Sequence, residues 1–268
     1  MLGDAARIAQ RRLRRVAPGT AALLTWQWAS RRDGLSASVV DQLVAEGDAV
    51  VDVGANWGLY TARLARLVGP SGQVDAFEPH PAHAVTLDRL ARRRPQVAVH
   101  KMGLADAPGT AALHVPVVRG RDVTALSSLT APAGDVEHRT VEVRIGRLDD
   151  ELAGRRPPSF VKCDVEGLEL AVLRGGERTL TAARPALLVE IEQRHQQRPI
   201  GDTFAYLAGL GYEGHYFAAG GLAPLERFDV ERDQLAHLGA GVVEYGMPEG
   251  YVADFLFVAP GTDLSRLG

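Results

Sequence analysis

Short apolar runs alternate with amphipathic helical runs along most of the chain from residue 49 onward. The segment AVVDVG (49–54) is typical of a buried strand, and LYTARLARLVG (59–69) repeats its apolar residues at helical spacing. The same alternation returns downstream, with strands predicted at 72–79, 96–103, 159–167 and 185–192. This pattern indicates an α/β fold, with a mainly parallel sheet and helices on both of its faces.

Three parts of the chain depart from this alternation. Residues 1–47 contain helical spacing at 4–16 and 36–47, and the first 32 residues carry seven arginines against one aspartate. We therefore expect a basic helical extension at 1–47, followed by one α/β domain at 48–268. Residues near 108–148 and 219–250 show no strand–helix alternation, and we expect both to be insertions beside the sheet.

Composition limits the functions open to the chain. Its net charge of −3 argues against general nucleic-acid binding, which needs a strongly basic face. A single cysteine excludes an intrachain disulfide and favours a reducing compartment. No apolar stretch of about 18 residues is present, so we expect no membrane span and a cytoplasmic location. The basic extension could act as a lid, an anchor or a contact between copies, which leaves homodimer formation open.

The segment DVGANWG (52–58) places two glycines where a buried strand becomes a helix. In open α/β sheets ligands bind beyond the carboxyl ends of strands, and glycine lets the backbone approach a ligand closely. Glu78 ends the next predicted strand, 24 residues after Gly54. A carboxylate at that position can accept hydrogen bonds from both hydroxyls of a ribose, so the pattern predicts an adenosine-type ligand.

The glycine spacing separates the candidate cofactors. Dinucleotide sites have the pattern G-x-G-x-x-G, but Asn56 stands where the second glycine would lie. The phosphate-loop pattern is absent as well. A nicotinamide-dependent oxidoreductase is therefore disfavoured, although it remains an alternative together with a cofactor-binding module that has no catalytic activity.

Five motifs occur in a recognisable order: VVDVGANWGLYT, FEPHP, FVKCDVEGLELAVLRGG, PALLVEIE and DFLFVAP. Together they resemble the FkbM family of S-adenosylmethionine-dependent methyltransferases, from about residue 49 to residue 260. The resemblance implies a Rossmann-like class I methyltransferase sheet of seven strands, with the last strand antiparallel. It also implies S-adenosylmethionine as cofactor, with the contacts assigned to Asp52, Gly54, Ala55, Asn56, Gly58, Glu78, Leu104, Ala105 and Asp106.

The candidate catalytic residues lie at the ends of the fourth and fifth predicted strands. Strand alternation places Lys162 and Asp164 on one face, and Lys162 is one of only two lysines among 30 basic side chains. Glu190 near the end of the fifth strand and His195 just beyond it compete as general base. Asp164, Glu190 and Glu192 could instead form an oxygen-rich Mg²⁺ site. The resemblance does not require a metal, so we predict none.

Other polar residues nearby have simpler expected roles. Glu166 is expected to cap the next helix, favoured there by the helix dipole. His80 and His83 are expected to face solvent, and Ser127 and Ser128 are candidates for contact with the methyl acceptor. By family analogy the expected reaction is O-methylation of a hydroxyl on a small molecule, such as a sugar or another secondary-metabolite scaffold.

Overall fold

The computed structural model describes residues 17–22, 25, 34–118, 120–124, 127–129, 137–218, 221–238, 248–265 and 267. The basic helix expected at residues 4–16 lies outside this part of the chain. The second expected helix of the extension is α3 (Gly34–Leu43), which ends before the turn that contains Gly47. Among the described helices, none combines the length and the apolar character that a membrane crossing requires.

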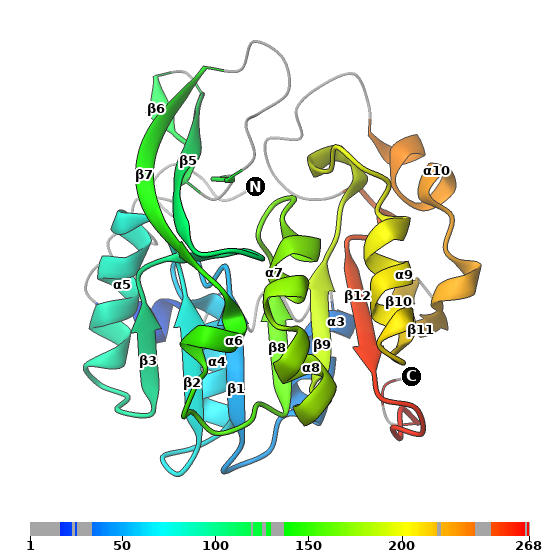
Figure 1. Ribbon diagram of the computed structural model, residues 1–268, viewed down its shortest axis with the longest axis horizontal. Coiled ribbons are helices and arrows are strands. Elements are labelled where there is room, and N and C mark those ends of the chain that lie inside the picture. Colours follow the sequence, from blue (N-terminus) through cyan, green and yellow to red (C-terminus); the bar gives the residue numbers. More distant parts are fainter. Residues whose placement is uncertain are drawn as a thin grey trace.

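A single eight-stranded sheet forms the centre of the molecule, in the order β11-β10-β12-β9-β8-β1-β2-β3 (Figure 1). Strands β3, β2, β1, β8 and β9 run parallel, whereas β12 is antiparallel to both of its neighbours. The seven-stranded sheet with a reversed last strand is therefore confirmed, and β11 adds an eighth strand at the edge. The strand bounds are β1 (Ala49–Val53), β2 (Gln73–Phe77), β3 (Val97–His100), β8 (Phe160–Cys163), β9 (Ala186–Glu190), β10 (Glu213–Ala218), β11 (Gly221–Pro224) and β12 (Asp254–Val258).

Helices cover both faces of this sheet (Figure 1). Successive residues of β1 show how: Val50 belongs to the same apolar cluster as Leu64 of α4, and Val51 to the same cluster as Leu173 of α7. One face is covered by α3, α4 (Leu59–Leu67) and α5 (Pro81–Ala91). The other is covered by α6 (Leu148–Glu151), α7 (Glu169–Gly175), α8 (Glu177–Ala183) and α9 (Gly201–Gly209). The short helices η2 (Gln193–His195), η3 (Leu225–Arg227), α10 (Val230–Asp233) and η4 (Leu235–His237) connect the later strands.

A second, smaller sheet stands over the carboxyl ends of the parallel strands (Figure 1). Its order is β4-β7-β5-β6, and β5 pairs antiparallel with β7 along most of its length. The bounds are β4 (Gly103–Leu104), β5 (Gly109–Val118), β6 (Arg121–Asp122) and β7 (His138–Gly146). The β-like runs within residues 108–148 thus form a hairpin above the edge of the main sheet where ligands bind.

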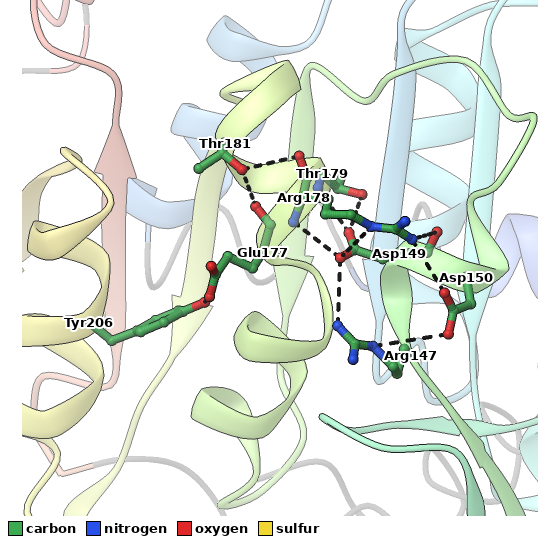
Figure 2. Close-up of polar contacts among 8 residues, drawn as sticks. All are labelled: Arg147, Asp149, Asp150, Glu177, Arg178, Thr179, Thr181 and Tyr206. Atoms are coloured by element: carbon green, nitrogen blue, oxygen red, sulfur yellow. Dashed lines mark hydrogen bonds and ion pairs between the residues drawn. The ribbon is translucent and has the colours of Figure 1, made fainter.

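The carboxylate of Asp149 joins α6 to the start of α8 (Figure 2). Its Oδ1 accepts hydrogen bonds from the backbone N–H and the hydroxyl of Thr179, at 2.9 and 2.8 Å, and its Oδ2 accepts from the backbone N–H of Arg178 at 3.1 Å. Burial raises the pKa of Asp149, but these hydrogen bonds outweigh burial and hold the pKa below its usual value. Asp149 therefore caps a helix that begins 28 residues later in the chain.

Substituting Asp149→Ala is expected to lower the free energy of unfolding by about 2–4 kcal/mol at pH 7, because buried donors lose a charged acceptor. A lowered folded-state pKa stabilises the protein above the unfolded pKa of about 4, and this contribution is lost as the pH falls through the folded value. Urea denaturation measures the free energy of unfolding at pH 7 and at pH 3. The difference in this free energy between variant and wild type should be smaller at pH 3. The exposed neighbour provides the control Asp150→Ala, and equal effects of the two substitutions would contradict this account.

Candidate active site

The loop after β1 adopts backbone conformations that favour glycine or asparagine, with φ of +78° at Gly54, +51° at Asn56 and +93° at Gly58. A Cβ atom at Gly54 would lie 1.7 Å from the backbone oxygen of Asp164, so β1 and β8 end too close together for any side chain there. The amide of Gly54 also donates to the backbone oxygen of Phe77 at 3.0 Å. The bare backbone thus brings the carboxyl ends of β1, β2 and β8 to one place.

Gly58 has a different environment from Gly54, because it faces α5 and does not line the pocket. A Cβ atom there would lie 2.9 Å from Cδ2 of Leu87. We expect Gly58→Ala to lower the free energy of unfolding by about 1–2 kcal/mol through its positive φ, with little change in cofactor affinity. Chemical denaturation and calorimetric titration measure the two effects, and Gly209→Ala, in open space on α9, is the control. A tenfold loss of affinity in folded Gly58→Ala would instead support the predicted cofactor contact.

A pocket opens between the carboxyl ends of β1, β2 and β8 and the smaller sheet. Its wall is apolar at Phe77, Met102, Leu104, Leu113 and Leu129, and polar at Asn56, Glu78, Asp164 and Glu166. An apolar slot with a few polar groups suits a nucleoside, whose base is flat and whose sugar needs hydrogen-bonding partners. Four of the predicted cofactor residues line it: Gly54, Asn56, Glu78 and Leu104.

The carboxylate of Glu78 is held in place by backbone donors. Its Oε2 accepts from the N–H of Asn56, and its Oε1 accepts from the N–H of His80, both at 2.7 Å. The residue is only 5% exposed, yet it contributes to the pocket wall. Each carboxylate oxygen keeps a second lone pair, so a fixed Glu78 can accept hydrogen bonds from two ribose hydroxyls.

The remaining predicted cofactor residues surround the pocket without lining it: Asp52, Ala55, Gly58, Ala105 and Asp106. Asp52 is 1% exposed and accepts a hydrogen bond from the hydroxyl of Thr61 at 2.5 Å. Burial raises the pKa of Asp52 to about 6. The carbonyl of Ala105 packs against Gly175 of α7, and Asp106 is exposed in the turn that follows. Their cofactor contacts stay predictions.

The expectation that His80 and His83 face solvent is wrong. His80 is 8% exposed, and its Nδ1 accepts a hydrogen bond from the backbone N–H of Ala82 at the start of α5. His83 lines the pocket, and its Nε2 lies 2.9 Å from the hydroxyl oxygen of Thr124. The smaller sheet folds over the start of α5, and this contact across 41 residues leaves no sign in the local sequence pattern.

Lys162 lies at the centre of three carboxylates. Its Nζ is 3.9 Å from Asp164, 3.7 Å from Glu190 and 3.8 Å from Asp254, and the ring centroid of Tyr60 lies 5.2 Å away. Lys162 itself is 1% exposed, whereas the carboxylates are partly open to solvent. Asp254 is not among the residues predicted from the sequence; it begins β12 directly beside Glu190 in the antiparallel register. No local pattern marks Asp254, because it reaches Lys162 only through this pairing of β12 with β9.

The pKa values of Lys162, Asp164 and Glu190 are all raised above their usual values. Burial lowers the pKa of Lys162, but the surrounding carboxylates outweigh burial and raise it well above its usual value. Burial raises the pKa of Asp164 to about 7 and that of Glu190 well above its usual range. Lys162 is therefore an ammonium ion at neutral pH, and Asp164 is the group of this set that lines the pocket.

Glu166, Glu192 and His195 form a second cluster beside the first. His195 Nε2 lies 3.0 Å from Glu166 and 3.4 Å from Glu192, and Arg194 pairs with Glu192 at 2.8 Å. Burial lowers the pKa of His195, but the two carboxylates raise it to about 9. At neutral pH the ring is consequently an imidazolium ion, so the predicted role of His195 as a base requires it to lose that proton first.

Two further expectations concern the loop after β8. Glu166 does not cap α7: its φ is +54°, and Glu169 accepts from the backbone N–H of Gly167 at 2.9 Å at that helix start. Ser128 donates its hydroxyl hydrogen to the backbone oxygen of Glu166 at 2.7 Å, and Ser127 lines the pocket. The loop between β6 and β7 is therefore tied to the loop that carries Glu166.

Comparison with known proteins identifies the family to which the chain belongs. The family model described as the methyltransferase FkbM domain matches residues 52–213, about three fifths of the chain. A search of curated proteins gave no match. Among solved structures, the FkbM methyltransferase from Methylobacillus flagellatus superimposes with a TM-score of 0.50 at 18% identity. That match covers 78% of this chain and 43% of that protein, so the chain spans about two fifths of its length.

Two other solved structures have similar folds with lower scores. Fibrillarin from Aeropyrum pernix, solved with bound S-adenosylmethionine, has a TM-score of 0.45 at 13% identity. The match covers 81% of this chain and 68% of the fibrillarin chain. An S-adenosylmethionine-dependent O-methyltransferase from Thermotoga maritima has a TM-score of 0.42 at 15% identity, over 85% and 66% of the two chains. With the family match over most of the sheet and the pocket, the chain belongs to the FkbM methyltransferase family, and its cofactor is S-adenosylmethionine.

Proposed function

We propose that this protein transfers the methyl group of S-adenosylmethionine to a hydroxyl group on a small molecule. The observation that carries the proposal is the position of Asp164, which lines the same pocket as Glu78 and whose carboxylate lies 3.9 Å from the fixed ammonium of Lys162. A hydroxyl acceptor must lose a proton as its oxygen gains the methyl group, and a positioned carboxylate can take that proton.

The residues of the chain then have distinct tasks. The bound cofactor supplies an electrophilic methyl group on a sulfonium. Glu78 binds the ribose hydroxyls, while the apolar wall at Leu104 and Leu113 excludes water from the base. Asp164 accepts the proton of the acceptor O–H bond as that bond breaks. Lys162 keeps the neighbouring carboxylates in place through its charge, and alignment of the two substrates supplies much of the rate.

Membership of the FkbM methyltransferase family argues against the alternative function of a nicotinamide-dependent oxidoreductase. A binding module without catalysis would have no use for a buried ammonium ion beside the carboxylate of a pocket residue, because burying a charged group is costly. A small-molecule acceptor is favoured over nucleic acid by the net charge of −3 and by the carboxylates around Lys162. We also propose that the Mg²⁺ alternative at Asp164, Glu190 and Glu192 does not apply, because Lys162 already occupies the space between Asp164 and Glu190.

The test is methyl transfer from S-adenosylmethionine carrying a tritiated methyl group to panels of hydroxylated sugars and polyketides, amines, and RNA. Products are separated and the site of the new methyl group is determined by NMR. The proposal expects methyl ethers from the hydroxylated panel. Methylation confined to amines or to RNA would contradict it while leaving the assignment to the methyltransferase family intact.

A further inference from the structure

We propose that Glu166, Glu192 and His195 form a binding site for one divalent metal ion at the rim of the cofactor pocket. Within the described part of the chain, this is the group of three or more metal-binding side chains whose ligand atoms come together, all within 4.8 Å of one another. It shares Glu192 with the Asp164, Glu190 and Glu192 set considered from the sequence, but its other two ligands are Glu166 and His195. The site adds to the methyl-transfer chemistry proposed above, and its existence does not depend on that chemistry.

Two of the three distances between donor atoms match a metal coordination sphere, and the third pair, Glu166 and Glu192, lies within 4.8 Å. His195 Nε2 lies 3.0 Å from Glu166 Oε2 and 3.4 Å from Glu192 Oε1. Nitrogen and oxygen ligands bond to a divalent ion at roughly 2.0–2.2 Å, which places neighbouring ligands about 3.0–3.5 Å apart. His195 Nε2 is buried and makes no hydrogen bond of good geometry, although both carboxylates lie within 3.4 Å of it.

The kinds of donor narrow the choice of ion. One imidazole and two carboxylates form a set that suits Mn²⁺ or Zn²⁺ better than Ca²⁺, which prefers oxygen ligands alone. Three protein ligands also leave at least one coordination position open, as in metal sites that bind a substrate. Glu166 lines the cofactor pocket, so an open position would lie at its rim.

The backbone holds Glu166 and His195 together with little freedom. A Cβ atom at Gly167 would lie 2.4 Å from the backbone oxygen of His195, so the two loops meet backbone to backbone. Glu166 has a left-handed φ of +54°, a conformation that costs energy in a residue other than glycine and is concentrated at functional sites. The hydrogen bond from Ser128 to the Glu166 carbonyl supports this conformation from the other side.

Glu192 is held in place by a charged neighbour. The residue is 4% exposed, and Arg194 contacts its two carboxylate oxygens at 2.8 and 3.0 Å. Partners of this kind orient metal ligands in many sites, and each carboxylate oxygen keeps a lone pair for the ion. The competing arrangement is an ion-pair network in which His195 carries a proton in place of the metal.

If the proposed O-methylation holds, the ion would bind the acceptor hydroxyl and lower its pKa, which assists removal of the proton by Asp164. This step rests on the proposed function, whereas metal binding does not. The test therefore measures binding of Mn²⁺ alone, without cofactor or acceptor. Its failure leaves methyl transfer standing, and a failure of O-methylation leaves the metal site standing.

The experiment titrates Mn²⁺ into the chelator-treated full chain and follows the free ion by electron paramagnetic resonance. We expect one tightly bound ion per chain, with the dissociation constant raised at least about tenfold in Glu166→Gln and in His195→Gln. Glu213→Gln, on the exposed surface of β10, is the matched control and should bind as the wild type does. Far-UV circular dichroism checks folding, and Glu166→Gln decides the outcome if His195→Gln does not fold.

Three results would overturn the site. The wild type could fail to bind Mn²⁺ up to millimolar concentrations, which means that the cluster is an ion-pair network only. Both site variants could bind as tightly as Glu213→Gln. Binding could also be lost in Asp164→Asn while it is retained in Glu166→Gln, which would place the ion among the carboxylates around Lys162.

Discussion

Replacing Asp164 with asparagine is expected to lower the rate of hydroxyl methylation on the order of 10²–10⁴-fold, the usual contribution of a positioned general base. The amide has nearly the same shape but cannot accept a proton at neutral pH. It still lies beside Lys162, and removal of one of three carboxylates leaves that ammonium with two partners. The fold and the ribose site at Glu78 are therefore expected to survive the change.

Single-turnover methyl transfer measures this effect without interference from product release, and the dissociation constant of S-adenosylhomocysteine shows whether the cofactor site is intact. We expect that constant to change less than about fivefold. Asp202→Asn, on the exposed side of α9, provides the matched control. A variant that keeps more than a tenth of the wild-type rate would remove Asp164 from the role of base and leave Glu190 as the next candidate.

The second large effect is expected at Glu78, where Glu78→Gln should weaken S-adenosylhomocysteine binding by at least about 100-fold. Hydrogen bonds to a charged group contribute about 1.5–3 kcal/mol each, and two are expected to the ribose. The substitution also disturbs the backbone around the site, because both carboxylate oxygens accept hydrogen bonds from backbone N–H groups, those of Asn56 and His80. In glutamine, the amide nitrogen would meet one of these donors with a donor of its own.

Isothermal titration calorimetry compares Glu78→Gln with Glu226→Gln, an exposed residue of η3 far along the chain. The control should bind S-adenosylhomocysteine as the wild type does. Equal affinities of the two variants would show that Glu78 serves the loop after β1 and not the cofactor.

Much of the fold could be predicted because it depends on local patterns. The buried run at Ala49–Val53 and the helical spacing after it define a strand and a helix without reference to the rest of the chain. The reversal of β12 has no such local sign, and it was expected only because the motifs resemble those of a known family. β11 was not expected at all, since four residues of mixed character give too weak a pattern.

The same distinction between local patterns and long-range contacts applies to the residues of the candidate site. Glu78 and Asp164 follow predictable strands, and parallel strands bring their carboxyl ends together. Asp254 joins Lys162 only through the antiparallel register with Glu190, and that register could not be read from spacing. The sequence predicts a helix cap at Glu166 because it does not show that the backbone there is left-handed and that the carboxylate lies 3.0 Å from His195.

The most direct test of the central claim, that the pocket binds S-adenosylmethionine, is a thermal-shift titration of the full chain with S-adenosylhomocysteine and, separately, with NAD. A ligand present at 100 times its dissociation constant adds about 2.7 kcal/mol to the stability of the native state, which corresponds to a rise of several degrees in Tm. The account predicts that rise with S-adenosylhomocysteine and none with NAD. A rise with NAD and no response to S-adenosylhomocysteine would contradict it.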